Sequence, residues 1–410
     1  MNILIINCHT DNRGDEAAVH ALVDELNCIY DDLTITLSMR GEGRYPNLPN
    51  NVTSISQFIP AKKKAILANR VAIISKGKIS LSRREKKLID AIKKADLILH
   101  APGGPSIGDT YYNAEPTYLR IFDLIRALNK PYMFYAPSMG PFEKADRNEW
   151  RKKILQSSCG IALRDPVSAD HFRKLLPEIK VHQTLDSALQ HDVDLNDNQC
   201  KLNAYKELKS FLDSHEKCIG ITITDLQWHP VYSQDPELKN RIQNTFRSTI
   251  AYITQQGFGV IFIPQLYGNG NDYDLMSQYV TSSESCYVVK ADSDLYDAYF
   301  QQYLISKLYM VIGMRYHSNI FSAKMGTPFV SVSYEQKMQG FMKKIGLERY
   351  CIALNELNYE QLKARMKLVM DNYVEYRNYL LNLHDSMKKE SFETTELVNY
   401  IIKDRKLDSK

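Results

Sequence analysis

Arg315 and His317 are the pair of residues whose types and spacing best suit chemistry. They lie two residues apart in VIGMRYHSNIFSAK (311–324), between a short apolar run and a pattern typical of a helix start. In open α/β sheets, ligands bind beyond the carboxyl ends of strands, where the following helix N-terminus also offers N–H groups to an anion. We therefore predict an anion-binding and proton-transferring site here. A lone histidine more often has a structural role, which remains the alternative.

Three neighbours extend this candidate site. Ser318 begins the predicted helix, and residues 327–334 predict the next strand, which delivers Tyr334 and Lys337 to the same sheet edge. Lys337 would add a second cation next to Arg315.

Asp15 and Glu16 lie where a predicted strand at residues 1–7 gives way to a helix with apolar residues at helical spacing. A carboxylate at a helix N-terminus is stabilised by the helix dipole, so a capping acid pair is one interpretation. The other is that Asp15 binds or activates a substrate group.

Further candidates follow other predicted strands. Gly103 and Gly104 let the backbone approach a ligand closely, and Asp109 adds a carboxylate, although a structural turn explains two glycines equally simply. Arg164 is either an anion ligand or half of a local ion pair with Asp165, and its spacing favours the ion pair. Gln265 ends the strand predicted at 260–264.

Strands and helices alternate in two successive sets, which predicts an α/β protein with two Rossmann-like parallel-sheet domains facing a cleft. We place an N-terminal domain at residues 1–190, a polar linker at 191–216, a C-terminal domain at 217–384 and a helix at 385–410 that crosses back to the first domain. A length of 410 residues fits two domains of about 200 residues each.

Composition points to a globular enzyme, since 44% of the residues are hydrophobic and 24% are charged. No apolar run approaches the roughly 20 residues that a membrane span needs, and no basic segment precedes the first strand, so we expect a cytoplasmic location. The seven cysteines are scattered without a CxxC pair, which favours reduced thiols. Ligand spacing implies no metal site.

Residues 61–94 concentrate positive charge. Twelve Lys and Arg face only Glu85 and Asp90, so this segment carries +10 while the rest of the chain carries −6. Because ILANRVAII lies among the charges, the segment suits a peripheral membrane surface as well as a solvated helix pair. Nucleic acid is the weaker interpretation, because no recognition motif accompanies the charge.

Several common motifs are missing from the sequence: a Walker A loop, GxGxxG after the first strand, HExxH and GxSxG. The corresponding nucleotide-binding, metalloprotease and hydrolase classes therefore lack support.

A set of short motifs resembles the polysaccharide pyruvyl transferase family over residues 3–347: NRGDEA, SMGPF, LRDPVS, TLDSA and above all GMRYHSNIFSAKMGTPFVSVSYEQK. The resemblance implies a GT-B-like fold and the transfer of pyruvate from phosphoenolpyruvate onto a sugar as a cyclic ketal. The chain departs from the family pattern at Pro105, usually a third glycine, and at Gln265, where a histidine is common.

The resemblance also implies roles for individual residues. Arg315, with Arg164 or Lys337, would bind the carboxylate and phosphate of phosphoenolpyruvate, which is a co-substrate with no further cofactor. His317 would protonate C3, and Asp15 would bind or activate the sugar hydroxyl. The expected acceptor is a precursor of a surface or capsular polysaccharide carried on a polyprenyl diphosphate, which would bring the enzyme to the inner face of the plasma membrane through residues 61–94.

Two alternatives stay open at this point. One is a GT-B glycosyltransferase that uses a nucleotide sugar, and the other is a catalytically silent binding protein that has kept the fold.

Overall fold

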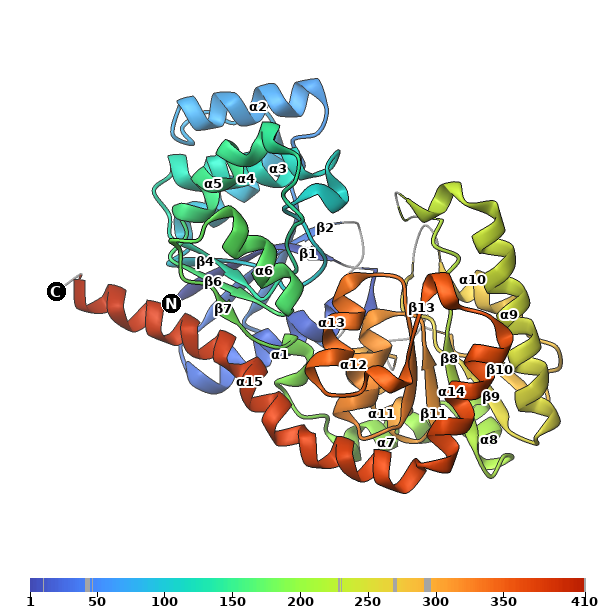
Figure 1. The fold of residues 1–410 in the computed structure, drawn as a ribbon. Helices are drawn as coiled ribbons and strands as arrows, with labels where there is room; N and C mark the ends of the chain where they lie inside the picture. Colours follow the sequence, from blue (N-terminus) through green and yellow to red (C-terminus); the bar gives the residue numbers. More distant parts are fainter. Residues whose placement is uncertain are drawn as a thin grey trace. The chain divides into compact units, whose positions relative to one another are not determined.

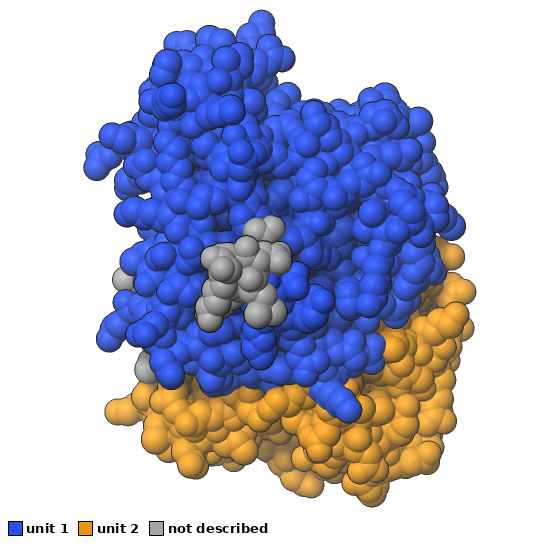
Figure 2. All heavy atoms as spheres, turned by 90° about the vertical axis from the view of Figure 1, so that its left-hand side faces the viewer, with its two compact units in different colours: residues 1–10, 18–191, 389–410 blue, residues 11–17, 192–388 orange. Residues whose placement is uncertain are grey.

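The computed structural model describes residues 1–9, 11–40, 45, 47–227, 229, 231–267, 271–290 and 296–408, with side chains as far as residue 404 (Figure 1). The chain forms two compact units (Figure 2). Unit 1 consists of residues 1–10, 18–191 and 389–410, and unit 2 consists of residues 11–17 and 192–388. All seven cysteines are free thiols.

Unit 1 is built on a parallel sheet of seven strands in the order β3-β2-β1-β4-β5-β6-β7. The order reverses direction at β1, which is the switch point where doubly wound folds place their ligands. The strands are β1 (Asn2–His9), β2 (Thr34–Arg40), β3 (Val52–Ser56), β4 (Leu97–His100), β5 (Tyr132–Tyr135), β6 (Gly160–Leu163) and β7 (His182–Gln183).

Alternate residues of β1 supply the two cores of unit 1. Ile3 and Ile5 join one apolar cluster, while Leu4 and Ile6 join the other, because successive side chains of a strand point to opposite faces. Helix α1 (Arg13–Ile29) and the end of α15 cover the first face. The second face is covered by α2 (Lys63–Ile74), α3 (Arg83–Lys94), α4 (Glu115–Ala127), α5 (Asn148–Gln156) and α6 (Pro166–Leu175).

Unit 2 is a second parallel sheet, of six strands in the order β10-β9-β8-β11-β12-β13. The strands are β8 (Cys218–Thr222), β9 (Gly259–Phe262), β10 (Cys286–Val288), β11 (Met310–Gly313), β12 (Phe329–Ser333) and β13 (Cys351–Ala353). The two parallel α/β sheets confirm the fold class expected from the sequence.

Among the helices of unit 2, α11 packs against α7 and α12, and α9 packs against α14. Their bounds are α7 (Leu195–Ala204), α8 (Lys206–Asp213), α9 (Pro236–Gln255), α10 (Asp272–Ser277), α11 (Ala298–Ser306), α12 (Tyr316–Lys324), α13 (Gln336–Lys344) and α14 (Tyr359–Asp371). Asn358 caps α14 by accepting the N–H of Gln361.

The last helix, α15 (Tyr373–Asp408), belongs to both units. In unit 2 the Tyr376 hydroxyl donates to the carbonyl of Phe329, and in unit 1 the hydroxyls of Thr395 and Tyr135 lie 2.5 Å apart. The predicted return of the C-terminal helix to the first unit is confirmed, and the helix begins earlier than expected.

Two helices, α7 and α8, occupy much of the stretch 191–216 that the sequence suggested as a linker. The polar run HDVDLNDNQ hides the start of α7, because Asp194 is its cap and accepts the N–H groups of Asn196 and Asp197. Polar side chains satisfy free backbone N–H groups both at a helix cap and in a loop, so a capping segment resembles a loop in composition.

Candidate active site

The junction between β11 and α12 carries Arg315 and His317. Gly313 ends the strand, and a Cβ there would overlap the side-chain amide of Asn319, so only glycine allows the helix to start this close. Thr222 Oγ1, on neighbouring β8, accepts the N–H groups of Met314 and Arg315 at 3.0 and 3.2 Å. The backbone that presents the two functional side chains is therefore fixed from an adjacent strand.

Ser318 belongs to the same locked junction. Its hydroxyl donates to the carbonyl of Arg315 at 2.6 Å and lies 2.9 Å from Thr222 Oγ1. The side chain is fully buried, so these contacts give it a clear positional role.

Arg315 is buried and held by a carboxylate that the sequence pattern did not identify. Its Nε donates to Oδ2 of Asp272 at 3.1 Å, and its Nη2 donates to Oδ1 of the same residue. Burial alone would lower the pKa of Arg315, but Asp272 and Tyr334 outweigh burial and raise it above the ordinary value. The guanidinium is therefore a permanently charged and oriented cation.

Asp272 also organises the loop after β9. Its Oδ2 accepts the N–H groups of Gln265 and Leu266 at 3.1 and 3.0 Å. The side-chain Nε2 of Gln265, which is 2% exposed, has no hydrogen-bond partner among the described residues. A buried N–H donor without an acceptor lowers the stability of the folded protein. Gln265 is therefore a candidate position for a ligand contact.

The first turn of α1 is part of unit 2 and packs against His317. A Cβ on Gly14 would overlap Cγ and Nδ1 of His317, so the imidazole lies directly against the glycine backbone. The segment is fastened by two backbone hydrogen bonds, from Arg13 N–H to the Gln265 carbonyl at 2.9 Å and from Tyr267 N–H to the Asp11 carbonyl at 2.7 Å. Gly14 and His317, although far apart in the sequence, therefore lie in contact within unit 2.

Asp15 follows Gly14 and is 7% exposed. The start of α1 is capped by Asn12, whose Oδ1 accepts the N–H groups of Gly14 and Asp15 at 2.8 and 3.4 Å. Capping by Asn12 leaves the Asp15 carboxylate available for another role.

Glu16 has a different task from its neighbour Asp15. Its carboxylate pairs with Arg13 and accepts the N–H of Ala298 at the start of α11. Burial raises the pKa of Glu16 to about 7, against the opposing effect of Arg13. Arg13 itself lies over the rings of Tyr267 and Tyr296, at 5.0 and 5.6 Å from their centroids.

Lys337 and Tyr334 lie just beyond the carboxyl end of β12. The Nζ of Lys337 is 2.6 Å from Oε2 of Glu335 and 5.5 Å from the ring centroid of Tyr316. Tyr334 helps to raise the pKa of Arg315. It also lines a cavity of about 330 Å³ near the carboxyl ends of β12 and β13.

The remaining predicted residues, Arg164, Gly103, Gly104 and Asp109, belong to unit 1. Arg164 is almost fully buried, and it donates from Nη1 to Asp186 at 2.5 Å and from Nε to Ser138 Oγ at 3.2 Å. The predicted ion pair with Asp165 is wrong, because Asp165 caps α6 by accepting the Ser168 N–H. An N-cap carboxylate turns toward the helix, away from the strand residue before it.

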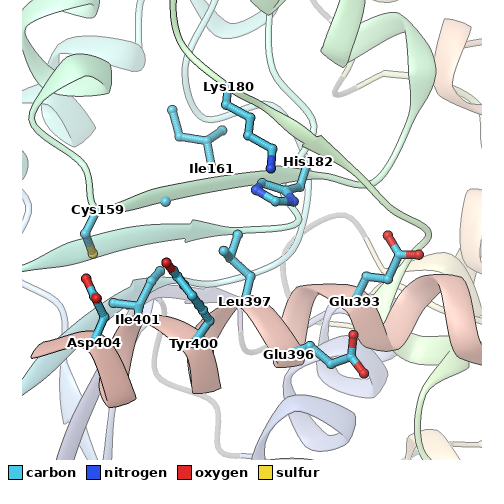
Figure 3. Close-up of a pocket in the computed structure, with 11 residues that line it drawn as sticks. Cys159, Ile161, Lys180, His182, Glu393, Glu396, Leu397, Tyr400, Ile401 and Asp404 are labelled. Atoms are coloured by element: carbon cyan, nitrogen blue, oxygen red, sulfur yellow. The ribbon is translucent and has the colours of Figure 1, made fainter. Parts of the chain in front are cut away.

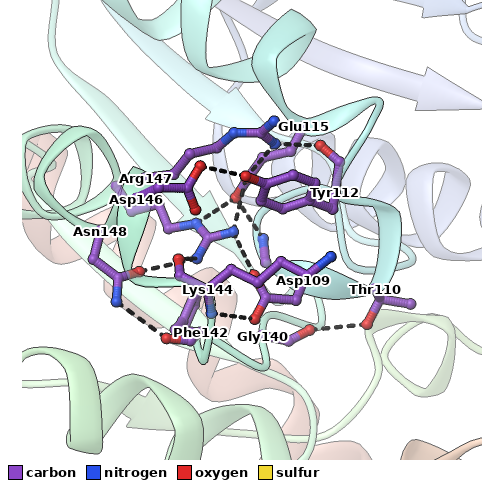
Figure 4. A network of polar contacts seen from close by, with 12 residues as sticks. Asp109, Thr110, Tyr112, Glu115, Gly140, Phe142, Lys144, Asp146, Arg147 and Asn148 are labelled. Carbon is purple, nitrogen blue, oxygen red and sulfur yellow. Dashed lines mark hydrogen bonds and ion pairs between the residues drawn. The ribbon is translucent and has the colours of Figure 1, made fainter.

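Asp109 is held in a polar network (Figure 4). It accepts the Lys144 N–H at 2.9 Å and the Arg151 Nη2 at 2.7 Å, and Arg151 in turn pairs with the buried Glu115. Burial would raise the pKa of Asp109, but the hydrogen bonds from Lys144 and Arg151 lower it below its ordinary value. The carboxylate therefore anchors the loop between β4 and α4.

Gly103 and Gly104 differ in their surroundings. Gly103 has a φ of 151°, and its carbonyl accepts the Ser138 N–H at 3.0 Å, so it joins the loops after β4 and β5. A Cβ on Gly104 would meet no atom within 4 Å, so this glycine borders open space.

A larger cavity of about 970 Å³ in unit 1 lies away from all of these residues (Figure 3). It is lined by the β6–β7 edge and by the end of α15, including His182, Lys180, Glu396 and Tyr400. Its mixture of acids and bases matches no single ligand class.

Two further features concern metals and membranes. Within the ranges described, no three His, Cys, Asp or Glu side chains gather as a metal site would require. Among the described helices, none has both the length and the apolar character of a membrane span.

Sequence comparison identifies relatives of the chain. The model of the family described as polysaccharide pyruvyl transferase matches residues 12–336. The amylovoran biosynthesis protein AmsJ of Erwinia amylovora is 24% identical over 411 residues, which cover 92% of this chain and 93% of that protein.

Solved structures with similar folds have little sequence identity. A MnaA–UDP structure from S. aureus has a TM-score of 0.58 at 11% identity and covers 100% of this chain and 98% of its own. A glycosyltransferase of Siraitia grosvenorii in complex with UDP has a TM-score of 0.56 at 10% identity, covering 98% and 99%. The UDP-GlcNAc 2-epimerase of Neisseria meningitidis has a TM-score of 0.54 at 13% identity, covering 98% and 100%. These similarities place the fold in the GT-B class and carry nothing about substrate.

Proposed function

The chain belongs to the polysaccharide pyruvyl transferase family, and on that premise we propose that it moves pyruvate from phosphoenolpyruvate onto a sugar as a cyclic ketal. The observation that carries this proposal is the packing of His317 against Gly14, next to Asp15 and the fixed cation Arg315, within unit 2. In the proposal, Arg315 binds the anion, His317 donates a proton and Asp15 supplies a carboxylate.

Phosphoenolpyruvate has a carboxylate and a phosphate, so its site needs more than one cation. Arg315 is charged and oriented by Asp272, which suits it to hold one of these anions. Lys337 supplies the second charge from the next strand end, shared with Glu335. Arg164 is proposed only as a support in unit 1, because Asp186 already neutralises it.

The reaction requires a proton at C3 of phosphoenolpyruvate while a sugar hydroxyl attacks C2. In the proposal, protonated His317 donates this proton, and the hydroxyl oxygen forms the new C2–O bond as Asp15 accepts its proton. Phosphate then leaves C2 with the electrons of its C–O bond. The departing phosphate takes the proton from Asp15. A second hydroxyl of the sugar then attacks C2 and closes the ketal, and its proton passes to His317, which is neutral after protonating C3.

The proposed acceptor is a sugar of a surface or capsular polysaccharide precursor carried on a lipid diphosphate. The relative AmsJ, which is named for amylovoran biosynthesis, supports a polysaccharide context. A lipid-linked acceptor would be met in the cytoplasm, at the inner face of the plasma membrane. Gln265, in unit 2, is a further proposed substrate contact, since its buried side-chain amide has no hydrogen-bond partner among the described residues. In unit 1, Gly104 borders open space that could receive a ligand.

The decisive experiment measures phosphate release from phosphoenolpyruvate with a polysaccharide precursor as acceptor. His317→Gln should lower kcat about 10²- to 10⁴-fold, because it removes the positioned acid but keeps the shape of the side chain. Thermal stabilisation by phosphoenolpyruvate should persist in this variant, whereas UDP-GlcNAc should stabilise neither protein.

His384→Gln is the matched control, because His384 lies on the surface part of α15 in unit 2 and should leave kcat unchanged. Near wild-type turnover by a folded His317→Gln variant would rule out the acid assignment. Stabilisation by UDP-GlcNAc without stabilisation by phosphoenolpyruvate would favour a nucleotide-sugar transferase instead.

A further inference from the structure

Helices α2 and α3 and the loop between them form a surface of unit 1 that we call the basic helix pair, residues 61–94. Figure 1 shows α2 as the outermost element of this unit, beyond α3 and α4. The part that contacts the unit is small: α2 buries only Ala68, Asn69 and Ala72.

Two large apolar side chains of α2 face outward. Leu67 is 58% exposed and Ile74 is 83% exposed, and with Arg70 between them they follow one helical stripe at spacings of three and four residues. A stripe turned toward the core would bury these residues. In α2 the small alanines take that place, so leucine and isoleucine are held in contact with solvent.

The loop after α2 extends the apolar surface with Ile79 and Leu81, which are 53% and 55% exposed. Five of the twelve exposed large hydrophobic residues in the described parts of the chain lie between Ile59 and Leu81. Single exposed apolar residues are ordinary, but such a concentration marks an interaction surface.

The same surface is strongly basic. All twelve Lys and Arg side chains between residues 61 and 94 are exposed. Of the two acids there, Glu85 is buried and accepts the Leu81 N–H at 2.7 Å, which leaves Asp90 as the exposed one. The partner must therefore carry negative charge and also accept apolar side chains.

We propose that the basic helix pair docks on the surface of an anionic phospholipid bilayer, with Leu67, Ile74, Ile79 and Leu81 entering the boundary between headgroups and acyl chains. Lysines and arginines around them neutralise lipid phosphates. Duplex nucleic acid fits less well, because its backbone offers nothing to four exposed aliphatic side chains. The inference is independent of the pyruvyl transfer reaction.

The test is co-sedimentation of the full chain with vesicles of phosphatidylcholine alone or mixed with phosphatidylglycerol. Binding is expected only with the anionic mixture and should weaken as salt rises. Leu67→Ser with Ile74→Ser, and separately Lys63→Glu with Lys64→Glu, should each lower the partition coefficient about tenfold or more.

Matched controls carry the same changes elsewhere. Leu195→Ser with Val374→Ser removes two comparably exposed apolar residues from unit 2, and Arg173→Glu with Lys174→Glu reverses two exposed charges on α6. Both controls should bind like the wild type, and every variant should keep its stabilisation by phosphoenolpyruvate.

Three outcomes would overturn the proposal: equal binding to neutral vesicles, no binding to anionic vesicles, or binding that depends on the charges but not on Leu67 and Ile74. The third result, together with binding of the protein to duplex DNA, would indicate a site for polyanions and not a membrane-docking surface. If the wild type binds anionic vesicles but shows no transferase activity, the result counts only against the proposed function.

Discussion

Arg315 and Arg164 are the residues whose surroundings matter most here, because each pairs with a carboxylate distant in sequence. Arg315 pairs with Asp272 in unit 2, and Arg164 pairs with Asp186 in unit 1. Removing water from a guanidinium is costly unless a carboxylate compensates at close range. Such a pair therefore orients a charge more than it adds stability, which is useful where an anion must bind.

Gly14 is the single residue on which the position of His317 depends most directly. Gly14→Ala would place a methyl group on the imidazole, so His317 must rotate or the first turn of α1 must move away. We expect kcat for pyruvyl transfer to fall about 100-fold, since displacements of about 1 Å in a catalytic group have effects of this size. Steady-state phosphate release measures the change.

Gly257→Ala is the control for this prediction. Gly257 has a φ of 80° and precedes β9, at the sheet edge opposite the candidate site, and a Cβ there would contact nothing within 4 Å. The variant should lose about 1 kcal/mol of stability through backbone strain while keeping its activity. Equal activity in Gly14→Ala and the wild type would show that His317 does not need its present position.

At the level of elements, the loop between β4 and α4 is held by a buried ionic network. Arg151 reaches from α5 to Asp109 in the loop and to Glu115 at the start of α4, and both Arg151 and Glu115 are fully buried (Figure 4). The network holds three elements of unit 1 together with charge-assisted hydrogen bonds.

Arg151→Met should therefore destabilise unit 1 by about 3 to 5 kcal/mol, because it removes the nearest cation from the buried Glu115, which keeps only Arg147 at 3.3 Å. Urea unfolding of a Trp228→Phe background would report on this unit through Trp150, which lies on α5. Arg173→Met removes an exposed pair with Asp170 and should change stability by less than about 1 kcal/mol. Similar losses in the two variants would refute the argument from burial.

For the whole molecule, acid stability should reflect a histidine in the core of unit 1. His100 ends β4, its Nδ1 lies 2.7 Å from the Ala101 carbonyl and its Nε2 lies 2.6 Å from Ser106 Oγ. Burial lowers the pKa of His100 to about 4, from an ordinary value of 6.5.

Between pH 6.5 and pH 4, His100 binds a proton in the unfolded chain but stays neutral in the folded protein. Stability from this group is thus complete above about pH 6.5 and is lost as pH falls toward 4, with a loss of about 2 kcal/mol by pH 5. His100→Asn should remove this part of the difference between urea unfolding at pH 7 and pH 5. An unchanged difference in the variant would show that His100 does not contribute.

Much of the fold followed from local pattern. Apolar β-branched runs located most of the strands but not β3, β7 or β13, helical spacing located α1, and the strand-to-helix junction at Gly313 was predicted from its composition. The pairing of Arg315 with Asp272 was not, because the two residues are 43 positions apart and each is ordinary in its own segment. No motif in the sequence singled out Asp272.

The sequence by itself determined most of the strands, several helices, the α/β class, and the motif residues that identify the family, because these depend on neighbours along the chain. Tertiary structure decided that residues 11–17 belong to unit 2, that Gly14 touches His317, and that Arg164 finds Asp186 in place of Asp165. Desolvation is the physical reason: a buried charge or an imidazole takes the partner that the packed fold brings within reach, whatever its distance in sequence.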